Sequence, residues 1–513
     1  MNIKQAKDYI ENTVRLYLKK NEFGEYRIPV VRQRPIFLLG APGIGKTAVM
    51  EQIAQDLNIA LVSYSMTHHT RQSALGLPFI AHKEYEGMSY DVSEYTMSEI
   101  IASIYEVMEA SGIKEGILFL DEINCVSETL APSMLQFLQY KVFGKHRVPE
   151  GWVIVTAGNP PEYNKSVREF DVVTMDRLKV LSVEADYQVW KEYANVRGLH
   201  PAVTNFLELK KEYFYKIETT VNGRTYVTAR GWEDLSEILK LYEEEGMKVD
   251  ENLVEQYLRN DKIVREFAAY YDLFLKYRRE YQVEEILTGT MEAKTVERAR
   301  IAAFDERLSL LGMLMDKVLS EIRENMETAD YLTELFKGLK AIKESLTKRR
   351  EKETSGENYR EQEVLADLLE KLAAGRKKQI ENLQMAGNLR EEDRRKNNRV
   401  IRFLEAAKKE VYLLSADTDA FVRVKEEFDR ELAEMKKETE RVSKRLCHLF
   451  DFVENAFAEG NEMLILVTEL TVNTYSAGFI SRFGCEPYVK YSSRLMLTER
   501  EALLKQEIEN LDL

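Results

Sequence analysis

One glycine-rich segment constrains the fold more than any other stretch of the sequence: Gly40-Ala41-Pro42-Gly43-Ile44-Gly45-Lys46-Thr47. It follows an apolar run at Ile36–Leu39 and precedes a helical pattern at Ala48–Leu57. Its glycines let successive backbone N–H groups point inward at phosphate oxygens, and the start of the next helix adds the positive end of its dipole. The segment therefore predicts a phosphate-binding loop between a strand and a helix.

Further apolar runs bounded by turn residues have the pattern of buried strands: Ala60–Val62, Ile117–Leu120, Val153–Ala157 and Leu178–Val183. Helical patterns separate them, notably at Met97–Ala110. Strands that alternate with helices indicate a parallel sheet with helices on both faces. We therefore expect residues 1–184 to form an α/β nucleotide-binding domain.

The rest of the chain has a helical pattern. There is no proline between Pro201 and Pro487, which is compatible with long helices. Residues 185–289 are expected to form a helical lid, and residues 290–513 an all-α, coiled-coil-like extension. Apolar residues from Phe428 to Val453 repeat at steps of three and four. This seam has two possible uses: contact with a partner, or pairing within an intramolecular hairpin.

Net charge limits the classes of partner. The formal charge is −14, which argues against broad nucleic-acid binding because that binding relies on Lys and Arg to neutralise phosphates.

The apolar runs are far shorter than the ~20 residues that a spanning helix needs, so no membrane segment is predicted. The N-terminus lacks the apolar stretch of a signal peptide. We expect a cytoplasmic protein.

Two carboxylates follow the apolar run Ile117–Leu120. In a parallel sheet, ligands bind at the carboxyl ends of strands, so Asp121 can face a metal ion beside Thr47. Glu122 can then orient a water molecule for attack on the γ-phosphate, while Lys46 places its charge near the β- and γ-phosphates. These residues predict a site for a nucleoside triphosphate and Mg²⁺.

Asn159 follows another buried strand, Trp152–Gly158, and its amide can contact the attacking water or the γ-phosphate. An asparagine before a proline is also a common turn residue. On its own, this position favours the turn interpretation.

Together these residues resemble the AAA+ superfamily and, within it, the MoxR family. Three stretches in the region from residue 30 to about 240 carry the finer resemblance: Gly76-Leu77-Pro78, the segment from Phe137 to Pro160, which resembles a β-hairpin and the strand after it, and Met175-Asp176-Arg177-Leu178. The resemblance implies an ATPase with ATP and Mg²⁺ as ligands. The loop residues implied to bind ATP are Gly40, Pro42, Gly43, Ile44, Gly45, Lys46, Thr47 and Ala48.

The resemblance also implies roles for three polar residues. Asn159 would sense the γ-phosphate. Arg177 would be the arginine finger that reaches the site of a neighbouring subunit, with Arg168 as the rival candidate. Arg230, which follows the expected helix cap Thr228, would contact the nucleotide from the lid. Arginine suits such positions because it stays charged and binds phosphate oxygens bidentately.

The same resemblance implies a hexameric ring, a chaperone-like remodelling function and a partner with a von Willebrand factor A domain. Two alternatives stay open. One is a GTP- or ATP-driven motor of a nucleic-acid restriction system, although the guanine-specific NKxD pattern is missing at Asn164–Val167. The other is a nucleotide-binding scaffold without hydrolysis.

Overall fold

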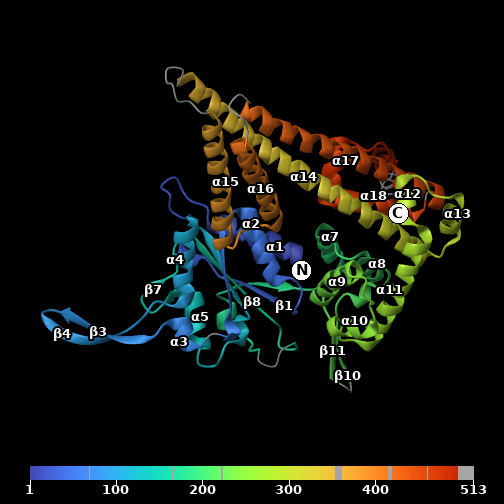
Figure 1. Ribbon diagram of the computed structural model, residues 1–513. Helices are drawn as coiled ribbons and strands as arrows, with labels where there is room; N and C mark the ends of the chain where they lie inside the picture. Colours follow the sequence, from blue (N-terminus) through green and yellow to red (C-terminus); the bar gives the residue numbers. More distant parts are fainter. Residues whose placement is uncertain are drawn as a thin grey trace, which may run out of the picture. The chain divides into compact units, whose positions relative to one another are not determined.

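The computed structural model describes residues 1–68, 70–163, 167–220, 223–352, 361–413, 419–458 and 460–494. The segment Asn164–Ser166 and the end of the expected extension, residues 495–513, lie outside them. The chain divides into two compact units (Figure 1): Met1–Val189 with Ala374–Asn397, and Trp190–Ala373 with Asn398–Leu513.

A five-stranded parallel sheet forms the centre of the first unit, with strand order β2-β5-β8-β1-β9. Its strands are β1 (Ile36–Gly40), β2 (Ala60–Ser65), β5 (Gly116–Asp121), β8 (Trp152–Gly158) and β9 (Lys179–Val183). Each contains one of the apolar runs predicted to be a strand, so the predicted parallel sheet is confirmed.

Helices cover both faces of this sheet because its central strands are apolar on both sides. Residues of α4 and α5 share a core with alternate residues of β1, β5 and β8, whereas α2 contacts β2 and β5, and α1 contacts β9. The helices of this unit are α1 (Ile3–Tyr17), η1 (Val30–Arg32), α2 (Lys46–Leu57), η2 (Met66–His68), α3 (Arg71–Leu75), α4 (Glu99–Ser111), η3 (Ile123–Cys125), α5 (Ala131–Tyr140) and α6 (Val172–Met175).

Two β-hairpins leave the sheet. The short one, β6 (Val142–Phe143) with β7 (His146–Arg147), confirms the hairpin expected before the Asn159 strand. The long one, β3 (Pro78–Tyr85) with β4 (Met88–Tyr95), extends away from the rest of the unit (Figure 1) and was not predicted. Its strands mix polar and apolar residues on both faces, which hides the alternation of a half-buried strand.

A turn between two long helices packs against the edge of the sheet. The helices are α15 (Glu361–Met385) and α16 (Glu391–Leu413), and their facing ends belong to the first unit. The free edge of β2 donates from Leu61 N to Ala386 O at 2.9 Å, and Arg390 forms an ion pair with Asp56 at 2.6 Å. We expected all residues after 290 to form a separate extension. The structure differs, because groups on β2 and α2 are hydrogen-bonded to residues about 330 positions later in the chain.

The second unit is mostly helical. Its first half contains α7 (Tyr187–Arg197), which begins at the end of the first unit, α8 (Pro201–Leu209), η4 (Lys211–Tyr213), a hairpin of β10 (Lys216–Thr220) and β11 (Gly223–Val227), α9 (Ala229–Glu244), α10 (Glu251–Tyr257), α11 (Asp261–Tyr281), α12 (Val283–Thr288) and α13 (Ala293–Ile301). The second half contains α14 (Phe304–Lys352), the outer parts of α15 and α16, α17 (Ala420–Phe457), α18 (Asn461–Val472) and α19 (Thr474–Phe483).

The apolar seams of α14 and α17 pack against each other in antiparallel orientation. One core joins residues 310–326 to residues 442–457, and a second joins residues 331–346 to residues 420–428. Asn325 and Thr439 form buried hydrogen bonds inside this interface, which fixes the register of the two helices. Within the described residues, the seam is used in an intramolecular hairpin, which was one of the two alternatives.

The first of these cores also crosses the expected boundary at residue 290. Tyr281, Ile286 and Leu287 share it with α14, α17 and α18. A chain that ended near Thr288 would expose these side chains, so the helices after residue 290 stabilise the region before it.

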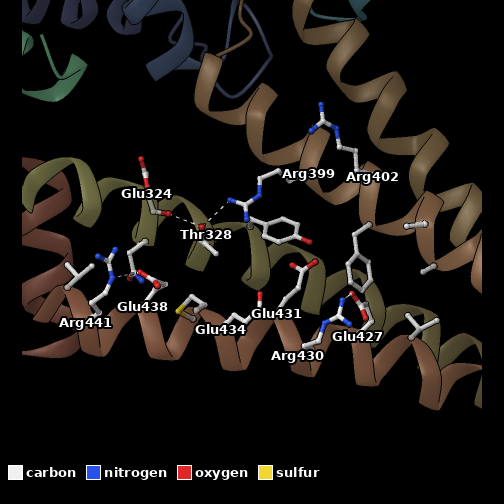
Figure 2. Close-up of a pocket in the computed structure, with 18 of the residues that line it drawn as sticks. Glu324, Thr328, Arg399, Arg402, Glu427, Arg430, Glu431, Glu434, Glu438 and Arg441 are labelled. Atoms are coloured by element: carbon white, nitrogen blue, oxygen red, sulfur yellow. Dashed lines mark hydrogen bonds and ion pairs between the residues drawn. The ribbon is translucent and has the colours of Figure 1, made fainter. Parts of the chain in front are cut away.

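A cavity of about 710 Å³ lies between α14, α16 and α17. Figure 2 shows Arg399 reaching Thr328 and a row of carboxylates along α17. Several of its charged groups pair with each other, as in the 2.8 Å contact of Arg441 with Glu438. None of the predicted site residues is among the residues that line it.

Among the described residues, no single helix is long and apolar enough to cross a membrane; α18 and α19, bent by 88° at their junction, satisfy the length and composition test only as a pair.

The contact between Gly387 and β2 gives a test of the edge packing. Gly387 has φ +63°, and a Cβ there would lie 2.7 Å from Leu61 O. We expect Gly387→Ala to lower the melting temperature and to speed hydrogen exchange in residues 59–65, because the clash and the strained backbone together cost about 1–3 kcal/mol. Gly375→Ala in α15 is the matched control, since nothing lies within 4 Å of its Cβ position. Equal exchange rates in the two variants would contradict this packing.

Candidate functional site

The predicted residues lie at the carboxyl ends of three parallel strands, β1, β5 and β8. Gly40 ends β1 and pairs with β9, Leu39 pairs with Gly158 of β8, and Ser65 of β2 pairs with Asp121 of β5. The loop after β1, the carboxylates after β5 and the amide after β8 therefore share one edge of the sheet. This edge is where open α/β sheets bind ligands.

The glycines of the loop are required by its backbone. Gly43 and Gly45 have φ values of +74° and +91°, which favour glycine. A Cβ on Gly40 would lie 2.8 Å from Val183 O, so this position also needs glycine for close packing against β9. Gly45 precedes α2, whose first residue is Lys46. The loop thus presents backbone N–H groups and a helix N-terminus to the same space.

Lys46 is almost fully buried. Its Nζ donates to Gly40 O at 2.8 Å, to Ala41 O at 2.9 Å and to Asn159 Oδ1 at 2.8 Å. These acceptors compensate the cost of removing the ammonium group from water. The contact places the side chain of Asn159 beside Lys46, which the turn interpretation would not require.

Thr47 and Asp121 form the second contact of the site. Thr47 Oγ1 donates to Asp121 Oδ2 at 3.1 Å, and the other carboxylate oxygen accepts from Glu122 N at 2.9 Å. A hydroxyl and a carboxylate on one side of a phosphate loop are the oxygen donors that Mg²⁺ prefers. This donor set fits Mg²⁺ bound to a triphosphate. Among the described residues, no group of three His, Cys, Asp or Glu side chains forms another metal site.

Glu122 has a left-handed backbone with φ +54° and directly follows β5. Its Oε2 accepts from Ser65 Oγ at 3.4 Å. Burial, and then the neighbouring charges of Glu122 and Asp121, raise the pKa of the Cys125 thiol, so the site holds two carboxylates beside a neutral thiol. Sequence reasoning missed Ser65; its signal was a hydroxyl at the end of a strand adjacent to β5.

Asn124 is a second residue that sequence reasoning missed. It is buried at 4% exposure, and its Nδ2 donates to Asn159 O at 2.8 Å. Its only sequence signal was its place three residues after Asp121. A buried asparagine cannot be assigned a partner from sequence, because the partner lies on a different strand.

The two candidate arginine fingers lie in different surroundings. Arg177 is exposed, and its side chain makes no hydrogen bond or ion pair to any residue that the structure describes. Its charge acts on Asp171, whose pKa is held below the usual range mainly by the hydrogen bonds of Thr174 and secondarily by Arg177. Arg168 instead pairs with Glu128 at 2.6 Å.

Arg230 lies in the second unit, at the start of α9. The Thr228 side chain accepts from Gly231 N at 3.3 Å, which confirms the predicted helix cap. Arg230 itself is exposed. It therefore lies on a capped helix start, as expected, and its contact with a nucleotide stays a prediction.

Comparison with known proteins gives one family match. Residues 36–174 match the model of the ATPase family associated with various cellular activities (AAA). None of the curated proteins compared with the chain matches it. Among solved structures, PCH-2 from C. elegans is similar with 16% identity and a TM-score of 0.24, over 41% of this chain and 48% of that one. The chain thus spans about half the length of that structure. The matched segment carries the phosphate loop, the two carboxylates and Asn159, so the likeness to this family covers the candidate site.

Proposed function

We propose that the chain hydrolyses ATP and uses the reaction to remodel protein partners, in the manner of the MoxR-like AAA+ ATPases. The observation that carries this proposal is the convergence of two contacts at one edge of the sheet: Lys46 with Asn159 at 2.8 Å, and Thr47 with Asp121 at 3.1 Å. A scaffold that only binds nucleotide needs Lys46, Thr47 and Asp121, but it has no need of the side chains of Asn159 and Glu122. The net charge of −14 disfavours the motor of a nucleic-acid restriction system.

The proposed binding step uses the loop Gly40–Ala48. Its backbone N–H groups and Lys46 hold the phosphates of ATP, and in doing so the ammonium group exchanges its oxygen partners for phosphate oxygens. Thr47 and Asp121 would hold Mg²⁺, which neutralises charge on the phosphates. The buried position of Lys46 supports this step, because a charge in a region of low dielectric interacts strongly with an anion.

The proposed chemical step uses Glu122 and Asn159. Glu122 orients and deprotonates the attacking water, and Asn159 contacts the water or the γ-phosphate. Ser65 holds the carboxylate of Glu122 at 3.4 Å.

The proposed assembly is a ring, a hexamer in the MoxR-like case, in which Arg177 completes the site of a neighbouring subunit. The exposed guanidinium of Arg177 supports this role better than Arg168, whose side chain is paired with Glu128. Arg230 would contact the nucleotide from the lid, and a protein with a von Willebrand factor A domain would be the partner. A cytoplasmic location completes the proposal.

The first test concerns the water-orienting carboxylate. Glu122→Gln should bind ATP as the wild type does and lower hydrolysis by about 10²- to 10⁴-fold, because only the base is lost. Lys46→Ala should weaken binding itself. Phosphate release and the affinity for a fluorescent ATP analogue are the two measurements. Glu109→Gln, which removes an exposed carboxylate on α4, serves as the control. Near wild-type turnover in Glu122→Gln would refute the assignment.

The second test concerns the shared site. If Arg177 acts across a subunit boundary, ATPase activity per chain rises with protein concentration. Arg177→Ala should bind ATP, assemble and lose about 10³- to 10⁵-fold in turnover, the usual cost of a missing finger. Arg168→Ala is the matched comparison and should lose far less. Activity that stays constant per chain where sedimentation finds only monomers would rule out a shared site, and the reverse order of the two losses would assign the finger to Arg168.

A further inference from the structure

We infer that Asn124 is a positioning residue for hydrolysis, which fixes the backbone of Asn159 so that its side chain faces the nucleotide. The inference rests on the proposed function and adds a residue that none of its steps contains. Asn124 lies in η3, three residues after the end of β5, whereas Asn159 follows β8. Asn124 therefore connects the end of β5, which carries Asp121, to the end of β8, which precedes Asn159.

The contact is direct and buried. Asn124 Nδ2 donates to Asn159 O at 2.8 Å, and Asn124 O accepts from Arg168 N at 2.9 Å. One asparagine thus holds both the residue that follows β8 and the later segment that contains Arg168. The hydrogen bond to Asn159 is buried, and a hydrogen bond shielded from water is electrostatically strong, so it restrains the backbone of Asn159.

Gly158 makes room for this contact. A Cβ at position 158 would lie 2.4 Å from Asn124 Oδ1 and 2.9 Å from Asn124 Nδ2. Real Cβ atoms do not approach so closely, so Asn124 can lie against β8 only when residue 158 is glycine. The φ of Gly158 is not among the positive values, and its lack of a side chain therefore serves packing rather than backbone conformation.

The two ends of Asn159 have different partners. Its side-chain Oδ1 accepts from Lys46 Nζ, and its backbone carbonyl accepts from Asn124. When Lys46 turns to phosphate oxygens, the side chain of Asn159 becomes available to the γ-phosphate. The hydrogen bond from Asn124 goes to the backbone carbonyl of Asn159 and not to its side chain, so this bond does not have to break when Lys46 changes partners.

The other side-chain atom of Asn124 supports a specific use of the amide. Asn124 Oδ1 is buried and has no hydrogen-bond partner among the described residues. A buried acceptor without a donor lowers stability, and an apolar side chain of similar size would avoid this cost. The hydrogen bond from its side-chain N–H group to Asn159 therefore explains why residue 124 carries an amide side chain.

The test is a double-mutant cycle of Asn124→Ala and Asn159→Ala in the full chain. Each single variant should lower kcat with little change in KM, Asn124→Ala by about 10- to 100-fold, the range found for residues that orient the ligands of a metal site. The double variant should be no slower than Asn159→Ala alone, because a positioning residue has no effect once its target is gone. Asn124→Asp, which keeps the shape and removes the donor, should behave like Asn124→Ala.

Binding gives a second measurement, independent of turnover. In the Glu122→Gln background, both single variants should lower the preference for ATP over ADP to the same extent, and the double variant should lower it no further. Gly158→Ala should reproduce the Asn124→Ala effect, because its new methyl group displaces the amide. A general loss of structure would instead weaken both nucleotides equally.

Asn205→Ala is the matched control. Asn205 is also buried, donates to a backbone carbonyl, that of Ser309, and lies against a glycine, Gly312. Its effects should add to those of Asn159→Ala. Additive effects of Asn124→Ala, with wild-type hydrolysis intact, would overturn the positioning role alone. Absence of hydrolysis in the wild type would overturn the proposed function and this inference with it.

Discussion

β1 lies between β8 and β9 in a parallel sheet, and the site depends on this pairing. Parallel strands end on the same edge, so the loop after β1 meets the polar residues that follow β8 and β5. Gly40 and Gly158 each lack a Cβ where one would clash, with Val183 O and with Asn124 respectively. Close packing at these two glycines brings the polar groups within hydrogen-bond distance.

Within that edge, the buried ammonium of Lys46 sets the electrostatics. It is balanced by two carbonyls and the amide of Asn159. These are neutral acceptors, so a phosphate, which carries full negative charge, can replace them favourably. The carboxylates Asp121 and Glu122 lie on the neighbouring strand end, where they suit a metal ion and a water molecule. The positive charge of the site thus lies in the loop after β1, and its negative charges lie at the end of β5.

Outside the site, polar contacts decide how distant segments pair. The turn at Ala386–Gly387 supplies the hydrogen-bond partner for the free edge of β2, which would otherwise be open to pairing with another chain. In the second unit, Arg445 is buried between Glu321 and Glu284, each at 2.9 Å. Removing one partner of a buried ion pair lowers the stability of the fold, so these contacts favour the packing of α17 against α12 and α14.

Local spacing and periodicity were enough to predict the strands of the parallel sheet, the phosphate loop, the carboxylates after β5 and the helical character of the second half. The sequence left the placement of the Asn159 side chain open, since a turn asparagine has the same local pattern, and it gave no clear sign of Asn124 and Ser65. It also could not place residues 374–397 against β2 or choose between the two uses of the α17 seam. These points became clear from the folded structure, because each rests on contacts between segments distant in the chain, and no local pattern encodes such a partner.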